Sequence, residues 1–118
     1  MLEDLGFVQQ QQIFDWVRAR SDAAPAVIDA RDVLENPKRI LGLLCDAVNV
    51  EFSESMLSWP SGLRESDGVW AKHWYGEVAR STAFQPYRPK HDQVPERLRE
   101  IYERCRECYQ SLYQDRLH

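Results

Sequence analysis

The sequence predicts a mainly α-helical, compact single domain over residues 1–118, with about five helices and one short β-strand at Ala26–Ala30. Apolar residues recur at helical spacing in several segments. A short run rich in β-branched residues, "AVIDA", stands by itself between two of those segments. The composition, 43% hydrophobic and 29% charged, is ordinary for a chain that buries one core.

The first predicted helix runs from about Glu3 to Arg20. Its apolar stripe consists of Leu2, Leu5, Gln9, Ile13 and Trp16, widened by Phe14 and Val17. The run Gln9–Gln12 tolerates either face of a helix, and we expect it on a solvated surface. "SDAAP" then breaks the chain before the strand.

The next helix has a well-marked start, because Asn36 is a good N-cap and Pro37 suits the first helical position. We expect this helix to stop near Asn49, which tolerates a left-handed terminus. Its core-facing residues are Ile40, Leu43, Leu44, Ala47 and Val48. Ser53 is then predicted to cap a short helix.

Two more helices are predicted in the second half of the chain. "VWAKHWYGEVARST" carries a ridge of Trp70, Trp74 and Val78. The last helix begins at about Pro95 and is the longest. One of its faces carries Leu98, Ile101, Tyr102, Cys105, Cys108, Tyr109 and Leu112, and Arg and Glu alternate on the other.

The charge balance argues against nucleic acid as a partner. Fifteen basic and 19 acidic residues give a net charge of −4, and they are interleaved without a positive stripe. The apolar runs are too short to span a bilayer, so no membrane partner is expected. "MLEDLGF" is acidic and unlike a secretion signal, which leads us to expect a cytoplasmic protein.

The cysteines and histidines offer little chemistry. Three cysteines are an odd number for a disulfide framework, and we expect reduced thiols. Cys105 and Cys108 form a C-x-x-C motif, but a zinc site needs a second ligand pair, and the motif falls mid-helix on an apolar stripe. His73 stands four residues before Glu77 as a candidate acid–base pair or a surface histidine. We therefore assign no catalytic residue and no metal ligand.

Residues 25–57, "PAVIDARDVLENPKRILGLLCDAVNVEFSESML", resemble the late strand–helix–helix portion of the sulfotransferase family, a branch of the P-loop α/β fold. "WPSG…DGVWAKHWYGEVARSTAF", residues 59–84, looks like the tail of bacterial sulfotransferase-like proteins. "GFVQQQQIFDWV" is similar to the helix that precedes the strand. The resemblance covers most of residues 6–87.

This resemblance implies transfer of a sulfuryl group from 3′-phosphoadenosine 5′-phosphosulfate. That chemistry needs a loop of backbone N–H groups around the phosphosulfate and a basic side chain beside it. None of the five glycines begins a Gly-Lys-Ser/Thr type of turn after a strand, so we expect a truncated domain without the donor loop and without a cofactor.

One segment resembles a nucleotide contact. "RESDGVWAKHW" is loosely similar to a late loop that touches the 3′-phosphate in animal cytosolic sulfotransferases, although the order of its residues differs. The resemblance implies that Arg64 and Lys72 bind the nucleotide. The alternative is a polar loop in which Asp67 caps a helix.

Two functions remain open on the sequence. The first is a non-enzymatic self-associating or binding module, since a lone strand must pair elsewhere and two copies could pair across a two-fold axis. Its candidate interface residues are Val27, Ile28, Trp70 and Trp74. The second is a fragment that binds 3′-phosphoadenosine nucleotides or transfers sulfuryl groups with a separately encoded partner. If the chain is an enzyme, the expected activity is that of a sulfotransferase, and a gene product without function is the third possibility.

Overall fold

The computed structural model describes residues 2–74 and 76–118, and these residues are mainly helical, as the sequence predicts. They form six α-helices and three 3₁₀-helices, and no strand is present in the described parts of the chain. The chain divides into two compact units. Unit 1 comprises residues 1–29 and 88–118, and unit 2 comprises residues 30–87.

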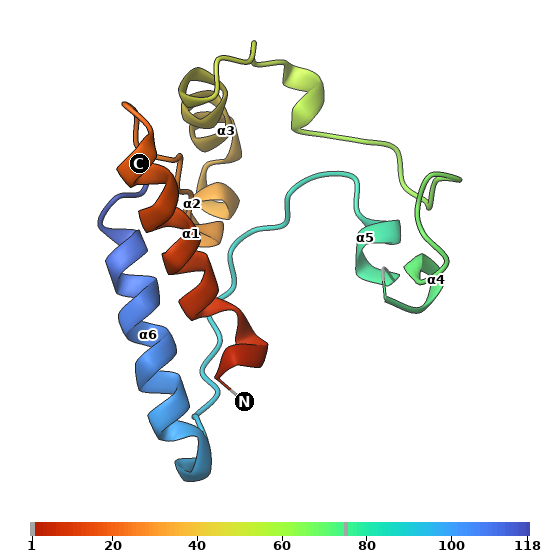
Figure 1. The fold of residues 1–118 in the computed structure, drawn as a ribbon. Helices are drawn as coiled ribbons and strands as arrows, with labels where there is room; N and C mark the ends of the chain where they lie inside the picture. The colour runs from red at the N-terminus through yellow and green to blue at the C-terminus, as the bar shows by residue number, and fades with distance from the viewer. Residues whose placement is uncertain (1, 75) are drawn as a thin grey trace. The chain divides into compact units, whose positions relative to one another are not determined.

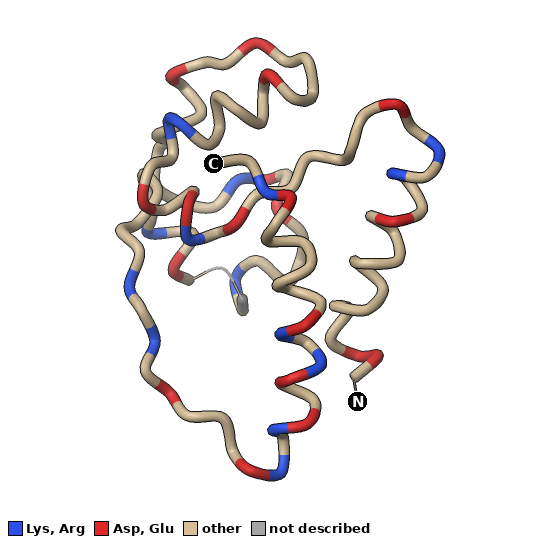
Figure 2. The backbone as a smooth tube through the Cα atoms, turned by 90° about the vertical axis from the view of Figure 1, so that its left-hand side faces the viewer, with Lys and Arg blue, Asp and Glu red and all other residues tan. Residues whose placement is uncertain are grey.

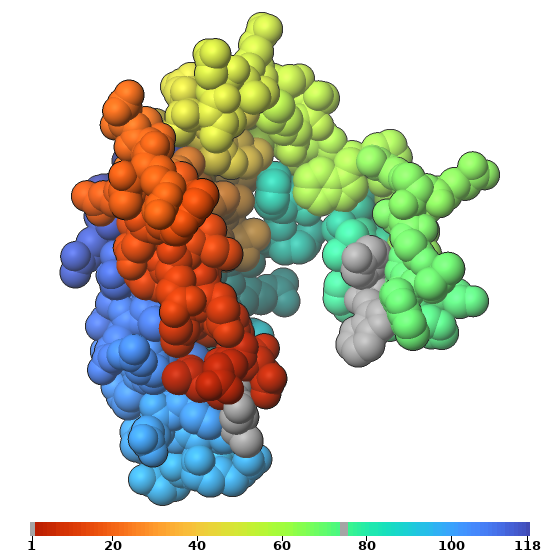
Figure 3. Space-filling model, viewed as in Figure 1, coloured from red at the N-terminus to blue at the C-terminus, as the bar shows by residue number. Residues whose placement is uncertain are grey.

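Unit 1 is a pair of long helices built from the two ends of the chain. A 3₁₀-helix, η1 (Glu3–Leu5), precedes α1 (Phe7–Arg20), and η3 (Glu96–Leu98) runs directly into α6 (Arg99–Tyr113). Helices α1 and α6 lie side by side (Figures 1 and 3). The buried residues between them are Phe14, Cys105, Cys108 and Leu112. Burying this apolar surface is what holds the pair together.

The face that α1 buries differs from the predicted stripe. Ile13 and Trp16 are 65% and 59% exposed, while Phe14 is buried. Packing against α6 selects the side of α1 that carries Phe14. Gly6, with a φ of 74°, also breaks the predicted helix, so that Leu2 and Leu5 lie outside α1. Gln11 is half-buried, and its Oε1 is buried without a hydrogen-bond partner.

The prediction that the last helix is the longest is confirmed, and part of its predicted apolar face is buried. Cys105, Cys108 and Leu112 are buried at helical spacing. Arginine and glutamate alternate along its remaining surface (Figure 2). The end of this helical segment is also tied to α1, because Arg18 lies 3.5 Å from the Asp115 carboxylate.

The predicted strand at Ala26–Ala30 is wrong. Residues 26–29 are irregular, and Ala30 begins helix α2 (Ala30–Glu35). A single strand leaves its backbone groups unpaired, whereas "ARDVLE" contains good helix formers. The carbonyl of Val27 accepts a hydrogen bond of 2.8 Å from the backbone N–H of Leu117 in the same chain.

Unit 2 begins with two packed helices, α2 and α3 (Pro37–Ala47). The predicted start of α3 is confirmed, since the Asn36 side chain accepts a 3.3 Å hydrogen bond from the Arg39 N–H. Its predicted end is also confirmed, because Asn49 adopts a φ of 58° just beyond the helix. Val33, Ile40 and Cys45 form the buried core of these helices.

The rest of unit 2 has short elements: η2 (Glu54–Met56), α4 (Ala71–Trp74) and α5 (Gly76–Arg80). Ser53 caps η2 as predicted, accepting from the Ser55 N–H at 3.3 Å. Trp59 ties two distant stretches together: its backbone N–H donates to the Thr82 carbonyl, and its indole N–H donates to Ser81 Oγ. The ring meets Phe84 edge-on, with centroids 5.3 Å apart.

No helix in the described residues has the length and apolar character needed to cross a membrane.

Candidate functional site

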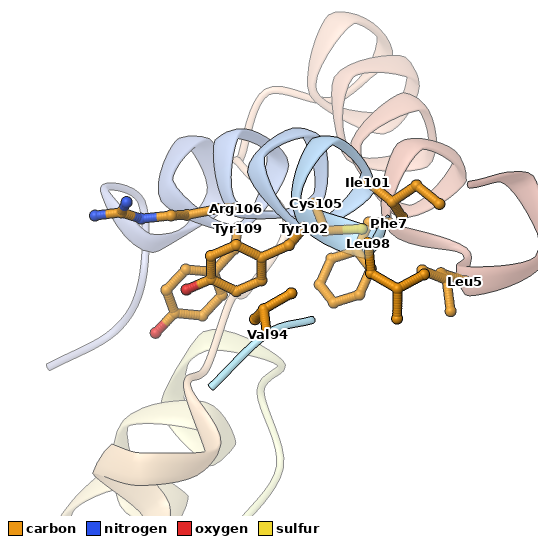
Figure 4. A pocket seen from close by; sticks show the side chains of 9 residues that line it. All are labelled: Leu5, Phe7, Val94, Leu98, Ile101, Tyr102, Cys105, Arg106 and Tyr109. Atoms are coloured by element: carbon orange, nitrogen blue, oxygen red, sulfur yellow. The ribbon is translucent and has the colours of Figure 1, made fainter. Parts of the chain in front are cut away.

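Unit 1 has an almost wholly apolar recess along α6, which we call the α6 groove (Figure 4). It has a volume of about 530 Å³. Its wall consists of Leu5, Phe7, Val94, Leu98, Ile101, Tyr102, Cys105, Arg106 and Tyr109. Arg106 is the one charged residue among these, and Figure 4 shows its guanidinium extending away from the apolar side chains. The recess therefore suits an apolar ligand or side chain.

Two tyrosines form the most prominent part of this groove. Tyr102 and Tyr109 are 43% and 44% exposed, and their rings project from the same side of α6 (Figure 4). They are seven residues apart, which is two helical turns. Tyr113 continues the row, and its ring lies 5.6 Å from that of Tyr109.

Tyr109 is held in place by Asp29. Its hydroxyl donates a hydrogen bond of 2.5 Å to Asp29 Oδ2, a residue 80 positions away in the sequence. This hydrogen bond to the carboxylate, together with partial burial, raises the pKa of Tyr109 to about 12. The phenol is therefore neutral at physiological pH, and the irregular segment at residues 26–29 has a fixed anchor on α6.

The sequence missed this groove as a site, although part of the signal was present. The helical periodicity predicts Tyr102 and Tyr109 on the apolar face of the last helix, together with the core residues. The structure separates that face into two rows, of which Cys105, Cys108 and Leu112 are buried and the tyrosines are half exposed. The contact between Tyr109 and Asp29 could not be predicted from the sequence, because the two residues are 80 positions apart and come together only in the folded chain.

The two predicted nucleotide-binding residues, Arg64 and Lys72, line one shallow recess of unit 2. The loop is closed by Asp67, whose Oδ2 accepts a 2.8 Å hydrogen bond from the Arg64 N–H. Asp67 therefore stabilises the turn before α4 and lines the same recess. The volume is about 230 Å³, below the size typical of pockets for drug-sized ligands.

The recess carries mixed charge. Two exposed cations favour an anion, and the Asp67 carboxylate beside them offsets part of that field.

The predicted interface residues lie in different places. Val27 is half-buried and Ile28 is 39% exposed in the irregular segment of unit 1. Trp70 is 67% exposed in unit 2. The side chain of Trp74 lies outside the described residues.

The cysteines and the His73–Glu77 pair are the other residues that the sequence analysis considered for chemistry. All three cysteines are buried free thiols, and Cys105 and Cys108 pack in the α1–α6 core. Glu77, the proposed partner of His73, forms an ion pair with Arg80 at 2.5 Å instead, and the His73 ring lies near Trp70. Over the described residues, no group of three His, Cys, Asp or Glu side chains could hold a metal ion.

Comparison with known proteins defines the family. Residues 2–102 match the family model described as "Sulfotransferase domain", so the chain belongs to the sulfotransferase domain family. This confirms the resemblance drawn from the sequence and extends its range from residues 6–87 to residues 2–102.

Two relatives from Arabidopsis thaliana are similar over shorter stretches. The chain is 34% identical over 88 residues to "Branched-chain-amino-acid aminotransferase-like protein 2", covering 75% of this chain and 16% of that protein. It is 47% identical over 60 residues to "Branched-chain-amino-acid aminotransferase-like protein 1", covering 51% and 11%. The chain thus spans a small part of the length of the curated relatives it matches. No solved structure is significantly similar to it.

Proposed function

We propose that the chain acts as a non-enzymatic, self-associating binding module of the sulfotransferase domain family, with the α6 groove as its contact surface. The single observation that carries this proposal is the groove itself: a recess of about 530 Å³ with a nearly continuous apolar wall. Leaving such a surface in water is unfavourable, and covering it is the common driving force of association.

A second copy of the chain is the occupant that the surface favours. Residues 96–107 carry four arginines and four glutamates, so the helix beside the groove has no net charge to repel an identical partner. A two-fold dimer uses the same patch twice, which doubles the apolar area covered by one set of residues. Exposed tyrosines are also enriched in such contacts.

The sequence supports a role without chemistry. Sulfuryl transfer needs a phosphate-binding loop, and none of the five glycines in these 118 residues stands in such a motif. The Arg64–Lys72 recess adds two cations and a carboxylate but no buried nest of backbone donors.

Sedimentation velocity across a range of protein concentrations tests the proposal. We expect a dimer at tens of micromolar. Tyr102→Glu places a charge in the apolar groove and should convert the dimer to monomer. Trp70→Glu is the matched control, because it makes the same change at an exposed aromatic residue of unit 2.

Three outcomes decide the matter. A dimer lost only in Tyr102→Glu supports the α6 groove. A dimer lost only in Trp70→Glu moves the interface to the surface that the sequence suggested. A natural chain that stays monomeric at all concentrations overturns the proposal.

Binding of a 3′-phosphoadenosine nucleotide is the second candidate, favoured by the shared recess of Arg64 and Lys72. Titration calorimetry with 3′-phosphoadenosine 5′-phosphate tests it. A heat of binding that is present in the natural chain and absent in Arg64→Glu would support nucleotide binding. No heat of binding at millimolar nucleotide would exclude nucleotide binding by the isolated chain. This experiment also tests whether sulfuryl transfer with a separate partner can use this loop.

A further inference from the structure

We infer that two copies of the chain pair through α6 in an antiparallel arrangement, in the register set by one row of alternating charges beside the groove. This inference rests on the proposed self-association and adds its geometry. The row, which we call the charge row, consists of Glu96, Arg99, Glu103 and Arg106.

The spacing of the charge row places it on one side of the helix. Its members are separated by three, four and three residues, and such positions share a helical face. Glu96 lies in η3 and its carboxylate meets Arg99, while the other three members lie on α6. Arg106 lines the α6 groove, and Glu103 lines a neighbouring recess together with Glu100 and Glu107. The charge row is exposed and borders the groove at Arg106.

The charges already pair within one copy. Arg99 Nε lies 3.0 Å from Glu96 Oε2, and Arg106 Nη1 lies 4.0 Å from Glu103 Oε2. Each end of the row therefore carries one arginine and one glutamate, and the signs of the four members alternate along the chain.

This order is self-complementary only when the second helix runs the other way. Rotation about a two-fold axis at the level of Ile101 brings Arg99 opposite the Glu103 of the second copy. The same rotation brings Glu96 opposite the Arg106 of the second copy. A parallel pair in register would place like charges together at all four positions, which is unfavourable. The apolar groove then supplies affinity, and the charge row selects direction and register.

Complementary charge variants test the inference. The acidic variant carries Arg99→Glu and Arg106→Glu, and the basic variant carries Glu96→Arg and Glu103→Arg. Each should dimerise about tenfold or more weakly than the natural chain, since every cross-pair becomes repulsive. An equal mixture should form a heterodimer that recovers the natural affinity, measured by sedimentation with one variant fluorescently labelled.

The matched control makes the same change in charge away from both recesses of unit 1. Lys90 and Arg97 are exposed and line neither recess, and Lys90→Glu with Arg97→Glu should leave dimerisation within about twofold of the natural value. Circular dichroism establishes that all variants retain their helices.

The results separate this inference from the proposed function. Suppose that the natural chain dimerises but the acidic and basic variants each dimerise as tightly as it does, or do not pair with each other. That result overturns the antiparallel register alone. A natural chain that never dimerises overturns both. Should a variant not fold, the salt dependence of the natural dimer decides: we expect several-fold weakening between low and high salt, and no change would contradict the inference.

Discussion

The two units of this chain are stabilised in different ways. Unit 1 joins the first and last helices, and its core is formed where α1 packs against α6. Unit 2 consists mostly of short elements that side-chain hydrogen bonds stabilise: the Asn36 cap, the Asp67 turn and the hydrogen bonds of Trp59. Among the described residues, each unit has four buried apolar side chains, so the difference lies in how the backbone is held rather than in the size of the core.

This difference indicates where a binding surface can form. Two long helices packed on one face leave the other face of α6 as a continuous wall, and the α6 groove occupies that wall. Unit 2 offers smaller recesses, and in one of them the Asp67 carboxylate already accepts a hydrogen bond from the Arg64 N–H.

The largest expected effect comes from breaking the core of unit 1. Phe14→Ala removes a buried aromatic ring and should lower the free energy of unfolding by about 3–5 kcal/mol. Ile13→Ala, at a neighbouring exposed position, should change it by no more than about 0.5 kcal/mol. Urea denaturation monitored by circular dichroism measures both, and similar losses would show that α1 buries a different face.

Alkaline pH should weaken unit 1 through Tyr109. Its pKa is near 10 when unfolded and about 12 when folded, so the stability it adds is fully present below pH 10 and is lost as pH rises towards 12. The full shift corresponds to about 2.7 kcal/mol, but the side chain is 44% exposed, and about 1 kcal/mol is a better expectation.

Comparison with Tyr109→Phe measures this contribution. Between pH 10 and 12, the natural chain should lose about 1 kcal/mol more stability than the variant, as judged by urea unfolding at each pH. Equal losses in the two proteins would show that the Asp29 hydrogen bond contributes nothing to stability.

A smaller effect is expected from removing a cap in unit 2. Asn36→Ala exposes the Arg39 N–H at the start of α3 and should cost about 0.5–1 kcal/mol. Ser53→Ala is the matched control, because Ser53 caps a 3₁₀-helix of only three residues and should matter less. Amide exchange in residues 37–47 measures the difference, and unchanged exchange in Asn36→Ala would mean that packing alone holds α3.

The parts of this fold that could be predicted are those determined by neighbouring residues. The Asn36 and Ser53 caps, the left-handed Asn49 and the buried row of α6 all follow from local sequence. The buried face of α1 did not, because packing against α6 buries Phe14 and leaves Ile13 and Trp16 exposed.

The irregular segment and the site required knowledge of the whole fold. "AVIDA" has the composition of a strand, but no second strand in the described residues is available to pair with it, and the Val27 carbonyl binds the Leu117 N–H instead. The α6 groove depends on Leu5, Phe7 and Val94 meeting α6 from distant parts of the chain. Helical periodicity identifies an apolar face but does not indicate which of its residues remain uncovered.

Hydrogen exchange at low and high protein concentration tests the central claim most directly, namely that unit 1 and not unit 2 carries the association surface. We expect exchange to slow with concentration in residues 94–109 and at the start of α1, and to stay unchanged across residues 58–84. Slowing confined to residues 58–84, or no change in either region, would contradict the account.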